Sequence, residues 1–280
     1  MKIIKTVKAM QKLSDSLRME GKSIGLVPTM GALHDGHLSL INMCAKVSDV
    51  TVVSIFVNKL QFAPSEDFDS YPKQLKKDKD AAQASGADYI FAPENDGLYS
   101  DDFSSFVRVE GLTENLCGAS RPDHFKGVTT VVAKLFNIVK PHKAFFGEKD
   151  FQQLVVIKRM VRDLNIDVRI YGGKIIREKD GLALSSRNAY LSSKERKKAT
   201  ALFRALKDSE RLYKGGEKSA FKIRENVVGL VKAVGFNIDY VKVVDIDTLE
   251  DVKSVNADVL LAVAAEIGGV RLIDNIKLKV

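Results

Sequence analysis

The chain has 280 residues, of which 45% are hydrophobic and 29% charged, and its formal net charge is +8 at pH 7. This composition is typical of globular proteins and excludes an intrinsically disordered chain. Because the length reaches the range in which single cores stop growing, we expect one large domain and one smaller domain.

Short β-branched runs alternate with helical patterns from residue 24 onward. This alternation predicts an α/β fold with a Rossmann-like, doubly wound parallel sheet, covered by helices on both faces and binding ligands at the carboxyl ends of its strands. The expected strands are residues 24–27, 50–57, 88–92, 144–146 and 167–171, and the expected helices are about 37–46, 73–85, 127–139 and 150–164.

The chain changes character after the turn-forming pair Gly172 and Gly173. Two charged helices are expected there, followed by strands around residues 239–244, 259–264 and 270–274. We therefore predict two domains, with the sheet domain at residues 1–175 and a smaller α+β domain at residues 176–280.

Most of the positive charge lies in residues 194–232, where 12 Lys and Arg face 5 Asp and Glu, a net charge of 12 − 5 = +7. Such a patch is compatible with a nucleic-acid-binding protein. However, Leu202, Phe203 and Leu206 follow helical spacing, and stacking aromatic residues are sparse. Amphipathic helices with a solvated outer face are the preferred interpretation, without a nucleic-acid partner.

Membrane and metal-binding classes find no support in the sequence. No segment approaches the about 20 apolar residues that span a bilayer, and the N-terminus lacks a signal-peptide pattern, so we expect a cytoplasmic protein with no membrane partner. Cys44 and Cys117 are far apart and have no CxxC spacing, so they are expected to be reduced thiols. These two thiols do not indicate a structural zinc site.

The segment from Pro28 to His37, PTMGALHDGH, joins an expected strand to a helix. A helix N-terminus attracts phosphate, and Gly31 allows close approach of the backbone. His34 and His37 are three residues apart and can face one ligand, where two imidazoles would stabilise charge on the phosphates of ATP. Alternatively, the two histidines only cap the helix or pack against it. Neither a Walker loop nor a GxGxxG fingerprint competes with this site.

Five segments together resemble the pantothenate synthetase (pantoate–β-alanine ligase) family of the HxGH nucleotidyltransferase superfamily. They are residues 28–40, 56–72, 116–141, 144–154 and 175–192. The resemblance implies ATP-dependent condensation of pantoate with β-alanine to pantothenate, for coenzyme A biosynthesis. It implies a pantoyl-adenylate intermediate, release of AMP and pyrophosphate, and a homodimer. Because residues 184–187 lie near the junction of the two expected domains, we also expect the second domain to act as a lid over the nucleotide- and pantoate-binding domain.

The resemblance also assigns roles to particular residues. The catalytic residues would be His37, His34, Lys149 and Arg187, with His37 as the proton donor. The expected ATP ligands are Met30, Gly31, His34, His37, Gly147, Glu148, Lys149, Asp150, Ile176, Leu184, Ser185, Ser186 and Arg187. The expected ligands of pantoate are Gln61 and Gln153. Asn58, Arg121 and His124 are further candidates for the substrate site by their position in the sequence, with a turn residue as the equal alternative for Asn58. Met30 is a candidate for the apolar wall around the substrate, with a core residue as the equal alternative. Mg²⁺ is expected to accompany ATP. Asp78 is a possible partner for it, although an exposed helix carboxylate is the preferred interpretation.

Two positions depart from the family pattern. Lys59 replaces the proline of Asn-Pro-x-Gln-Phe, and Asp123 replaces the glycine of Arg-Pro-Gly-His, which places a carboxylate near anionic substrates. Both changes affect the expected substrate affinity more than the reaction. The alternative enzyme is a related nucleotidyltransferase that joins ATP to a phosphorylated acceptor, and Gln61, Gln153 and the second domain argue against it.

Overall fold

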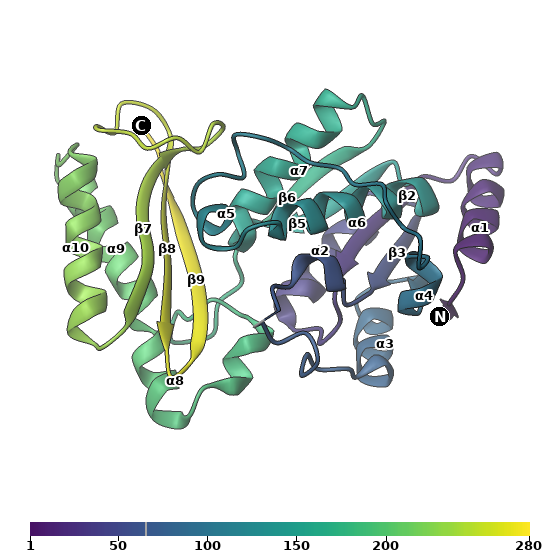
Figure 1. The fold of residues 1–280 in the computed structure, drawn as a ribbon, viewed down its shortest axis with the longest axis horizontal. Coiled ribbons are helices and arrows are strands. Elements are labelled where there is room, and N and C mark those ends of the chain that lie inside the picture. Colours follow the sequence, from purple (N-terminus) through teal and green to yellow (C-terminus); the bar gives the residue numbers. More distant parts are fainter. Residues whose placement is uncertain (65) are drawn as a thin grey trace. The chain divides into compact units, whose positions relative to one another are not determined.

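The computed structural model describes residues 1–64 and 66–280, except for the side chains of residues 95 and 96. It divides into two compact units (Figure 1). The first unit comprises residues 1–110, 121–148 and 153–174, and the second comprises residues 111–120, 149–152 and 175–280. Two short segments before residue 175 therefore belong to the second unit. The single boundary expected at residue 175 does not include them in it.

The first unit contains a six-stranded sheet in the order β1-β4-β3-β2-β5-β6. All neighbouring strands are parallel, so the predicted α/β doubly wound fold is confirmed. The strands are β1 Lys2–Ile4, β2 Ile24–Thr29, β3 Val50–Ile55, β4 Tyr89–Phe91, β5 Lys143–Gly147 and β6 Arg169–Gly173. The edge strand β1 was not predicted, because three residues are too few to show a period.

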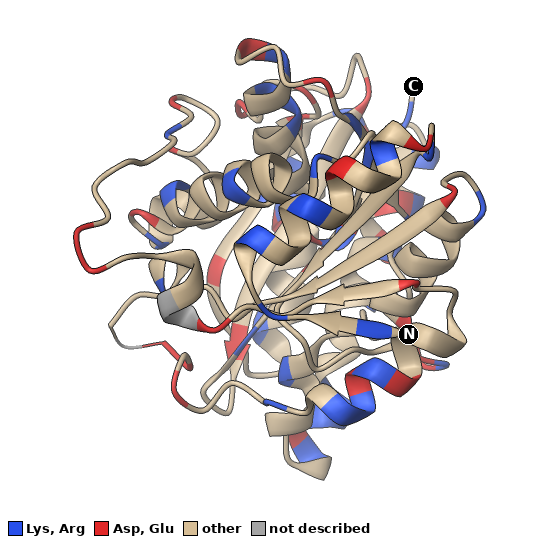
Figure 2. Ribbon diagram, turned by 90° about the vertical axis from the view of Figure 1, so that its right-hand side faces the viewer, with Lys and Arg blue, Asp and Glu red and all other residues tan. Residues whose placement is uncertain are grey.

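Helices cover both faces of this sheet, as expected. Leu26 and Val52 pack with residues of α1 and α6, whereas their neighbours Val27 and Val53 pack with residues of α2 and α3. This alternation follows from the two-residue period of a strand, and Figure 2 shows strands almost without charged residues. The helices are α1 Val7–Met19, α2 Asp35–Ala45, α3 Leu75–Ala84, α4 Asn95–Leu98, α6 His124–Val139 and α7 Phe151–Asp163, with 3₁₀ turns η1 Lys59–Gln61 and η2 Glu148–Asp150.

The order of the strands places the ligand-binding edge. Strand β2 pairs with β3 on one side and with β5 on the other, so the chain winds in opposite directions from β2. In open α/β sheets, ligands bind beyond the carboxyl ends of the strands at this switch point. Those ends are Thr29 and Gly147, which lead directly into the predicted ATP residues.

The second unit is an antiparallel sheet with helices packed on it. Its strands β7 Asn237–Asp245, β8 Val259–Ile267 and β9 Val270–Leu278 pair in chain order. Helices α9 and α10 lie alongside them in Figure 1, and Leu206, Val227 and Val263 belong to their common core. The helical segments are α5 Cys117–Ser120, η3 Ser186–Tyr190, α8 Ser193–Ala199, α9 Ala201–Lys214 and α10 Ala220–Ala233.

Three helices follow residue 192, where the sequence predicted two. A capping box of Ser192 and Glu195 starts α8. At its end the Thr200 hydroxyl donates to the carbonyl of Lys197 (2.9 Å), a local bond that competes with the helical pattern and separates α8 from α9.

The basic segment forms amphipathic helices, as its sequence predicts. In α9, Leu202 and Leu206 are buried, while the outer face carries ion pairs. Lys214 pairs with Glu210 and Arg211 with Asp208, each at 3.0 Å. Within the described ranges, no helix is long and apolar enough to cross a membrane.

Candidate active site

The two histidines of the HxGH turn both cap α2. His34 is the N-cap residue, and its Nδ1 accepts a hydrogen bond from the Gly36 N–H (3.2 Å). Nδ1 of His37 accepts from the His34 N–H (3.3 Å), and the ring centroids are 4.1 Å apart. A neutral imidazole has one donor and one acceptor. Because Nδ1 accepts in both rings, Nε2 carries the proton in the neutral form. Capping therefore prepares two N–H donors rather than excluding a binding role.

Gly36 provides the space for this arrangement. A Cβ at this position would stand 2.8 Å from Cε1 of His34, closer than non-bonded carbon atoms approach. The glycine of HxGH thus allows the first imidazole to fold over the helix N-terminus.

Asp78 in α3 holds the loop that precedes these histidines. This residue is only 2% exposed, and its two carboxylate oxygens accept hydrogen bonds from the N–H groups of Ala32 (3.0 Å) and Leu33 (2.8 Å). Gly31 and Ala32 both have positive φ, 89° and 51°, which turns successive N–H groups toward one anion. The expectation that Asp78 is an exposed carboxylate was therefore wrong, since both oxygens bind the loop.

A pocket of about 330 Å³ lies beside this loop, within the first unit. It is lined at the ends of β2, β3 and β4 by Met30, Gly31, Ile55 and Ala92, and also by Lys73. The carboxyl edge of the sheet is therefore concave next to the HxGH turn, as expected at a ligand-binding edge.

Three of the expected substrate residues lie together. The Gln61 side chain donates from Nε2 to Sδ of Met30 (3.2 Å) and accepts at Oε1 from Nδ2 of Asn58 (3.1 Å). Asn58 is buried, and its Nδ2 also donates to the Gly127 carbonyl (3.0 Å). Its Oδ1 accepts from the Tyr99 hydroxyl (2.9 Å). Burial raises the pKa of Tyr99, so the phenol remains a donor. Asn58 thus orients Gln61 through a side chain that is itself fixed.

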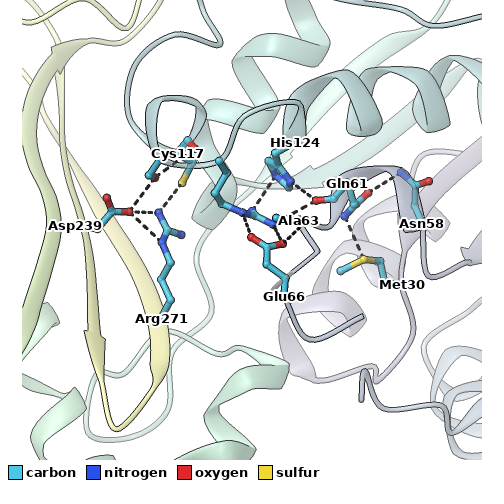
Figure 3. A network of polar contacts seen from close by, with 11 residues as sticks. Met30, Asn58, Gln61, Ala63, Glu66, Cys117, His124, Asp239 and Arg271 are labelled. Carbon is cyan, nitrogen blue, oxygen red and sulfur yellow. Dashed lines mark hydrogen bonds and ion pairs between the residues drawn. The ribbon is translucent and has the colours of Figure 1, made fainter. Parts of the chain in front are cut away.

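Arg121 has partners within the protein, and two of them, Glu66 and His124, are labelled in Figure 3. Its Nε and Nη2 donate to the two carboxylate oxygens of Glu66, each at 2.6 Å, and Nη1 lies 3.1 Å from Nε2 of His124. That the guanidinium contacts substrate stays a prediction.

Asp123, the second departure from the family pattern, is the N-cap of α6 in a left-handed conformation with φ 61°. Glycine suits such a position, and Asp is among the few other residues that tolerate it. The side chain is exposed. The substitution is therefore compatible with the local backbone.

Gln153 and its neighbour Gln152 differ in their contacts. Gln152 is buried and donates to the carbonyls of Leu112 (2.9 Å) and Asn115 (2.7 Å) while accepting from the Cys117 N–H (2.9 Å). The Gln153 amide is half-buried, and within the described part of the chain it makes no side-chain hydrogen bond. Gln153 is thus the glutamine of this pair that remains suited to a substrate.

The ATP residues predicted in the second unit fall into two segments. Lys149 is held by its backbone, because its carbonyl accepts from Nδ2 of Asn275 (2.9 Å). Its Nζ lies 3.9 Å from Oδ2 of Asp150, a half-exposed carboxylate. Asn275 itself is 5% exposed, so the turn that carries Lys149 rests on the core of this unit.

The second segment forms a short antiparallel turn, with a bridge between Arg177 and Ala183, that brings Ile176 and Leu184 together. The Leu184 N–H donates to the Ile176 carbonyl (3.0 Å). Ser185 then caps η3, accepting from the Arg187 N–H at 3.3 Å. The structure thus unites two segments that the sequence separates, and it places Ser186 and Arg187 in the 3₁₀ turn.

This turn is anchored by a residue pair that sequence reasoning did not identify. Arg177 donates from Nη1 and Nη2 to the carboxylate of Asp274 at 2.6 and 2.8 Å, and its guanidinium lies 4.0 Å from the centroid of the Phe203 ring. Asp274 is 3% exposed.

The sequence did not indicate the supporting roles of Tyr99, Asn275 and Asp274, since none of them has a fixed spacing from the residue it supports. Arg177 and Glu66 lie inside two of the resembling segments.

Comparison with known proteins decides the family. The Pantoate-beta-alanine ligase family model matches residues 2–277. The chain belongs to the pantoate–β-alanine ligase family. Its relatives include the "Pantothenate synthetase" of Geobacter sulfurreducens, 55% identical over 276 residues and 98% of each chain.

Solved structures of pantoate–β-alanine ligases support the same family assignment. The crystal structure of pantothenate synthetase from Thermus thermophilus is 41% identical, with a TM-score of 0.95 over 100% of both chains. The ligase from Francisella tularensis, described as complexed with "Beta-gamma ATP and Beta-alanine", is 34% identical, with a TM-score of 0.83 over 99% of this chain and 97% of that one.

Proposed function

We propose that the chain condenses pantoate with β-alanine in two steps. The pantoate carboxylate attacks the α-phosphorus of ATP, forming pantoyl adenylate and releasing pyrophosphate. The β-alanine amine then attacks the acyl carbon, forming the amide and releasing AMP. The overall ATP-dependent condensation is the activity of the family to which the chain belongs. The observation that carries the proposal is the HxGH turn with both Nδ1 atoms accepting hydrogen bonds.

The first step requires stabilisation of negative charge more than proton transfer. Nε2–H of His34 and Nε2–H of His37 are suited to donate to phosphate oxygens at the N-terminus of α2, where the helix dipole also favours an anion. His37 is the proposed proton donor. Met30 and Gly31 would approach the nucleotide through the loop that Asp78 holds.

Gln61 and Gln153 are the proposed ligands of pantoate. Neutral amides orient a carboxylate and hydroxyl groups without the strong ion pair that would weaken the carboxylate as a nucleophile. Met30 contacts Gln61 and offers an apolar surface for the methyl groups of pantoate. Asn58 acts through Gln61, whose Oε1 it binds.

The remaining proposed ATP ligands are Gly147 and Glu148 of the first unit and a larger group in the second unit. Lys149 and Arg187 would neutralise charge on the triphosphate, and Arg suits this role because it presents a fork of donors. The other proposed ligands in the second unit are Asp150, Ile176, Leu184, Ser185 and Ser186. Closure of residues 176–280 as a lid would exclude water from the adenylate. Equal distances between the two units with and without ATP in solution would contradict this.

Mg²⁺ is proposed to arrive with ATP, whose phosphates supply most of its ligands. The residues beside the HxGH turn are compatible with this arrangement. Both Asp78 oxygens already accept hydrogen bonds from backbone N–H groups, and Mg²⁺ that is held mainly by phosphates needs few protein ligands. A cytoplasmic location and a homodimer are also proposed. Light scattering that returns the mass of a single chain would contradict the dimer.

Exchange of labelled pyrophosphate into ATP tests the proposal. With pantoate present and β-alanine absent, only adenylation produces exchange, so we expect pantoate-dependent exchange that falls at least about 100-fold in His37→Ala. Thermal unfolding of the variant controls for loss of structure. Exchange that requires a phosphorylated acceptor instead of pantoate would favour the related nucleotidyltransferase activity.

A further inference from the structure

The backbone of Gln61 is held by residues from outside its own loop. Its carbonyl oxygen lies 2.8 Å from Nδ1 of His124 and accepts a longer bond from Nη2 of Arg121 (3.4 Å). The loop's own support is slight, because η1 is a single 3₁₀ turn in which the Gln61 N–H donates to the Asn58 carbonyl (3.2 Å). Figure 3 shows the His124 ring directed at the Gln61 carbonyl.

The hydrogen-bond pattern assigns the tautomer of His124. A guanidinium can only donate, so Nε2 of His124, 3.1 Å from Nη1 of Arg121, is the acceptor. A neutral imidazole with an acceptor at Nε2 has its proton at Nδ1. Nδ1–H therefore donates to the Gln61 carbonyl, and Arg121 determines which nitrogen of His124 does so.

Arg121 is in turn held in place by the loop. Its bidentate pair with Glu66 is 16% exposed on the arginine side and 21% on the glutamate side, and Glu66 also accepts from the Ala63 N–H (3.3 Å). The two carboxylate oxygens and Nε2 of His124 together occupy Nε, Nη2 and Nη1 of the guanidinium. Little donor capacity remains for a carboxylate ligand. The partners of the Arg121 guanidinium therefore fix its orientation.

We propose that His124 and Arg121 are positioning residues for the acid substrate, acting through Gln61 in place of the expected contact between Arg121 and substrate. This inference rests on the proposed function, in which Gln61 binds pantoate. An amide that orients a carboxylate must be held within about 0.5 Å, and the Gln61 side chain can be no better placed than its backbone. The carbonyl contact from His124 supplies that restraint, and Arg121 maintains the tautomer that makes it.

Substitution of His124 tests the donor. In His124→Leu the Nδ1–H donor is lost, whereas in His124→Asn the amide Nδ2–H lies close to the former Nδ1 and can still donate to the Gln61 carbonyl. We expect the KM for pantoate to rise about tenfold in His124→Leu and to stay within about threefold of the parent in His124→Asn. The KM for ATP should change less than about twofold in both. A pantoate KM that is unchanged in His124→Leu, or raised equally in both variants, would overturn the proposal.

A double-mutant cycle with Arg121→Lys tests the route of action. Lysine keeps the charge but cannot contact Glu66 and His124 together. If Arg121 acts through His124, Arg121→Lys should add less than about twofold to the pantoate KM of His124→Leu, although it raises the KM several-fold in the parent. Fully multiplicative effects would instead show that Arg121 acts independently of His124 and would overturn the proposed route through this histidine. A parent protein without pantoate-dependent pyrophosphate exchange would refute the proposed function itself, a result distinct from either of these.

Discussion

Gly127 in α6 lies directly against the carbonyl group of Leu60 in η1. A Cβ on Gly127 would stand 2.3 Å from the Leu60 oxygen and 2.6 Å from the Gln61 nitrogen. The Gly127 carbonyl also accepts from Nδ2 of Asn58 (3.0 Å). Helix α6 is thus the surface on which the proposed pantoate-binding loop rests.

Gly127→Ala should displace that loop. The Cβ meets backbone rather than a flexible side chain, so we expect a loss of about 1–3 kcal/mol of unfolding free energy from overpacking and a higher KM for pantoate. Gly229→Ala is the matched control, since Gly229 is also inside a helix and a Cβ there meets nothing within 4 Å. It should gain up to about 1 kcal/mol from helix propensity. Urea unfolding measures both, and equal effects would contradict the steric argument.

Asp78→Asn should weaken the loop before the HxGH turn. The amide of asparagine has one oxygen, so its NH₂ group would face one of the two backbone N–H groups that donate to the carboxylate. We therefore expect a loss of about 1–3 kcal/mol of stability. Adenylation should slow without a change in the Mg²⁺ concentration that gives half-maximal rate. Asp80→Asn, at an exposed position of the same helix, should change stability by less than about 0.5 kcal/mol. A large shift in Mg²⁺ dependence would indicate that Asp78 binds the metal.

Glu66 makes stability depend on acid pH. Burial alone would raise the pKa of the Glu66 carboxyl, but the hydrogen bonds and charge of Arg121 outweigh burial and lower it. A carboxyl with a depressed folded pKa stabilises the protein above its unfolded pKa of about 4.3, and this stabilisation is lost as the pH falls through the folded value. The difference in urea midpoint between the parent and Glu66→Gln should therefore be constant above about pH 5.5 and shrink below about pH 4.3. A difference that grows on acidification would contradict the assignment.

Lys59→Pro restores the family residue at the first position of η1. Proline is favoured at the first position of a helix, and Asn58 before it is extended, with φ −85° and ψ 103°, as a residue preceding proline prefers. The substitution reduces the freedom of the unfolded loop and should stabilise it by a few tenths to about 1 kcal/mol. We expect a modestly lower pantoate KM. An unchanged or higher KM would refute this account.

The sequence by itself determined the architecture of the first unit and the identity of the family. Buried parallel strands such as β2 and β3 are continuous apolar runs, and the HxGH turn joins a strand to a helix, so both are local patterns that one chain displays. Helix α1 is also readable from its spacing, because Met10 and Leu17 lie on its buried face, yet it was not among the predicted elements. Strand β1 shows no such pattern, since only its pairing with β4 makes it a strand.

The tertiary structure decided which polar residues are available for ligands. Asp78 looks like an exposed helix carboxylate in the sequence. Its partners Leu33 and Ala32 are 45 and 46 positions away, and only the fold brings them within hydrogen-bond distance. Arg121 pairs with Glu66 across 55 positions, and Tyr99 binds Asn58 across 41. A hydrogen bond needs two atoms about 3 Å apart, and between distant segments that distance depends on how helices pack on the sheet, which no local spacing encodes.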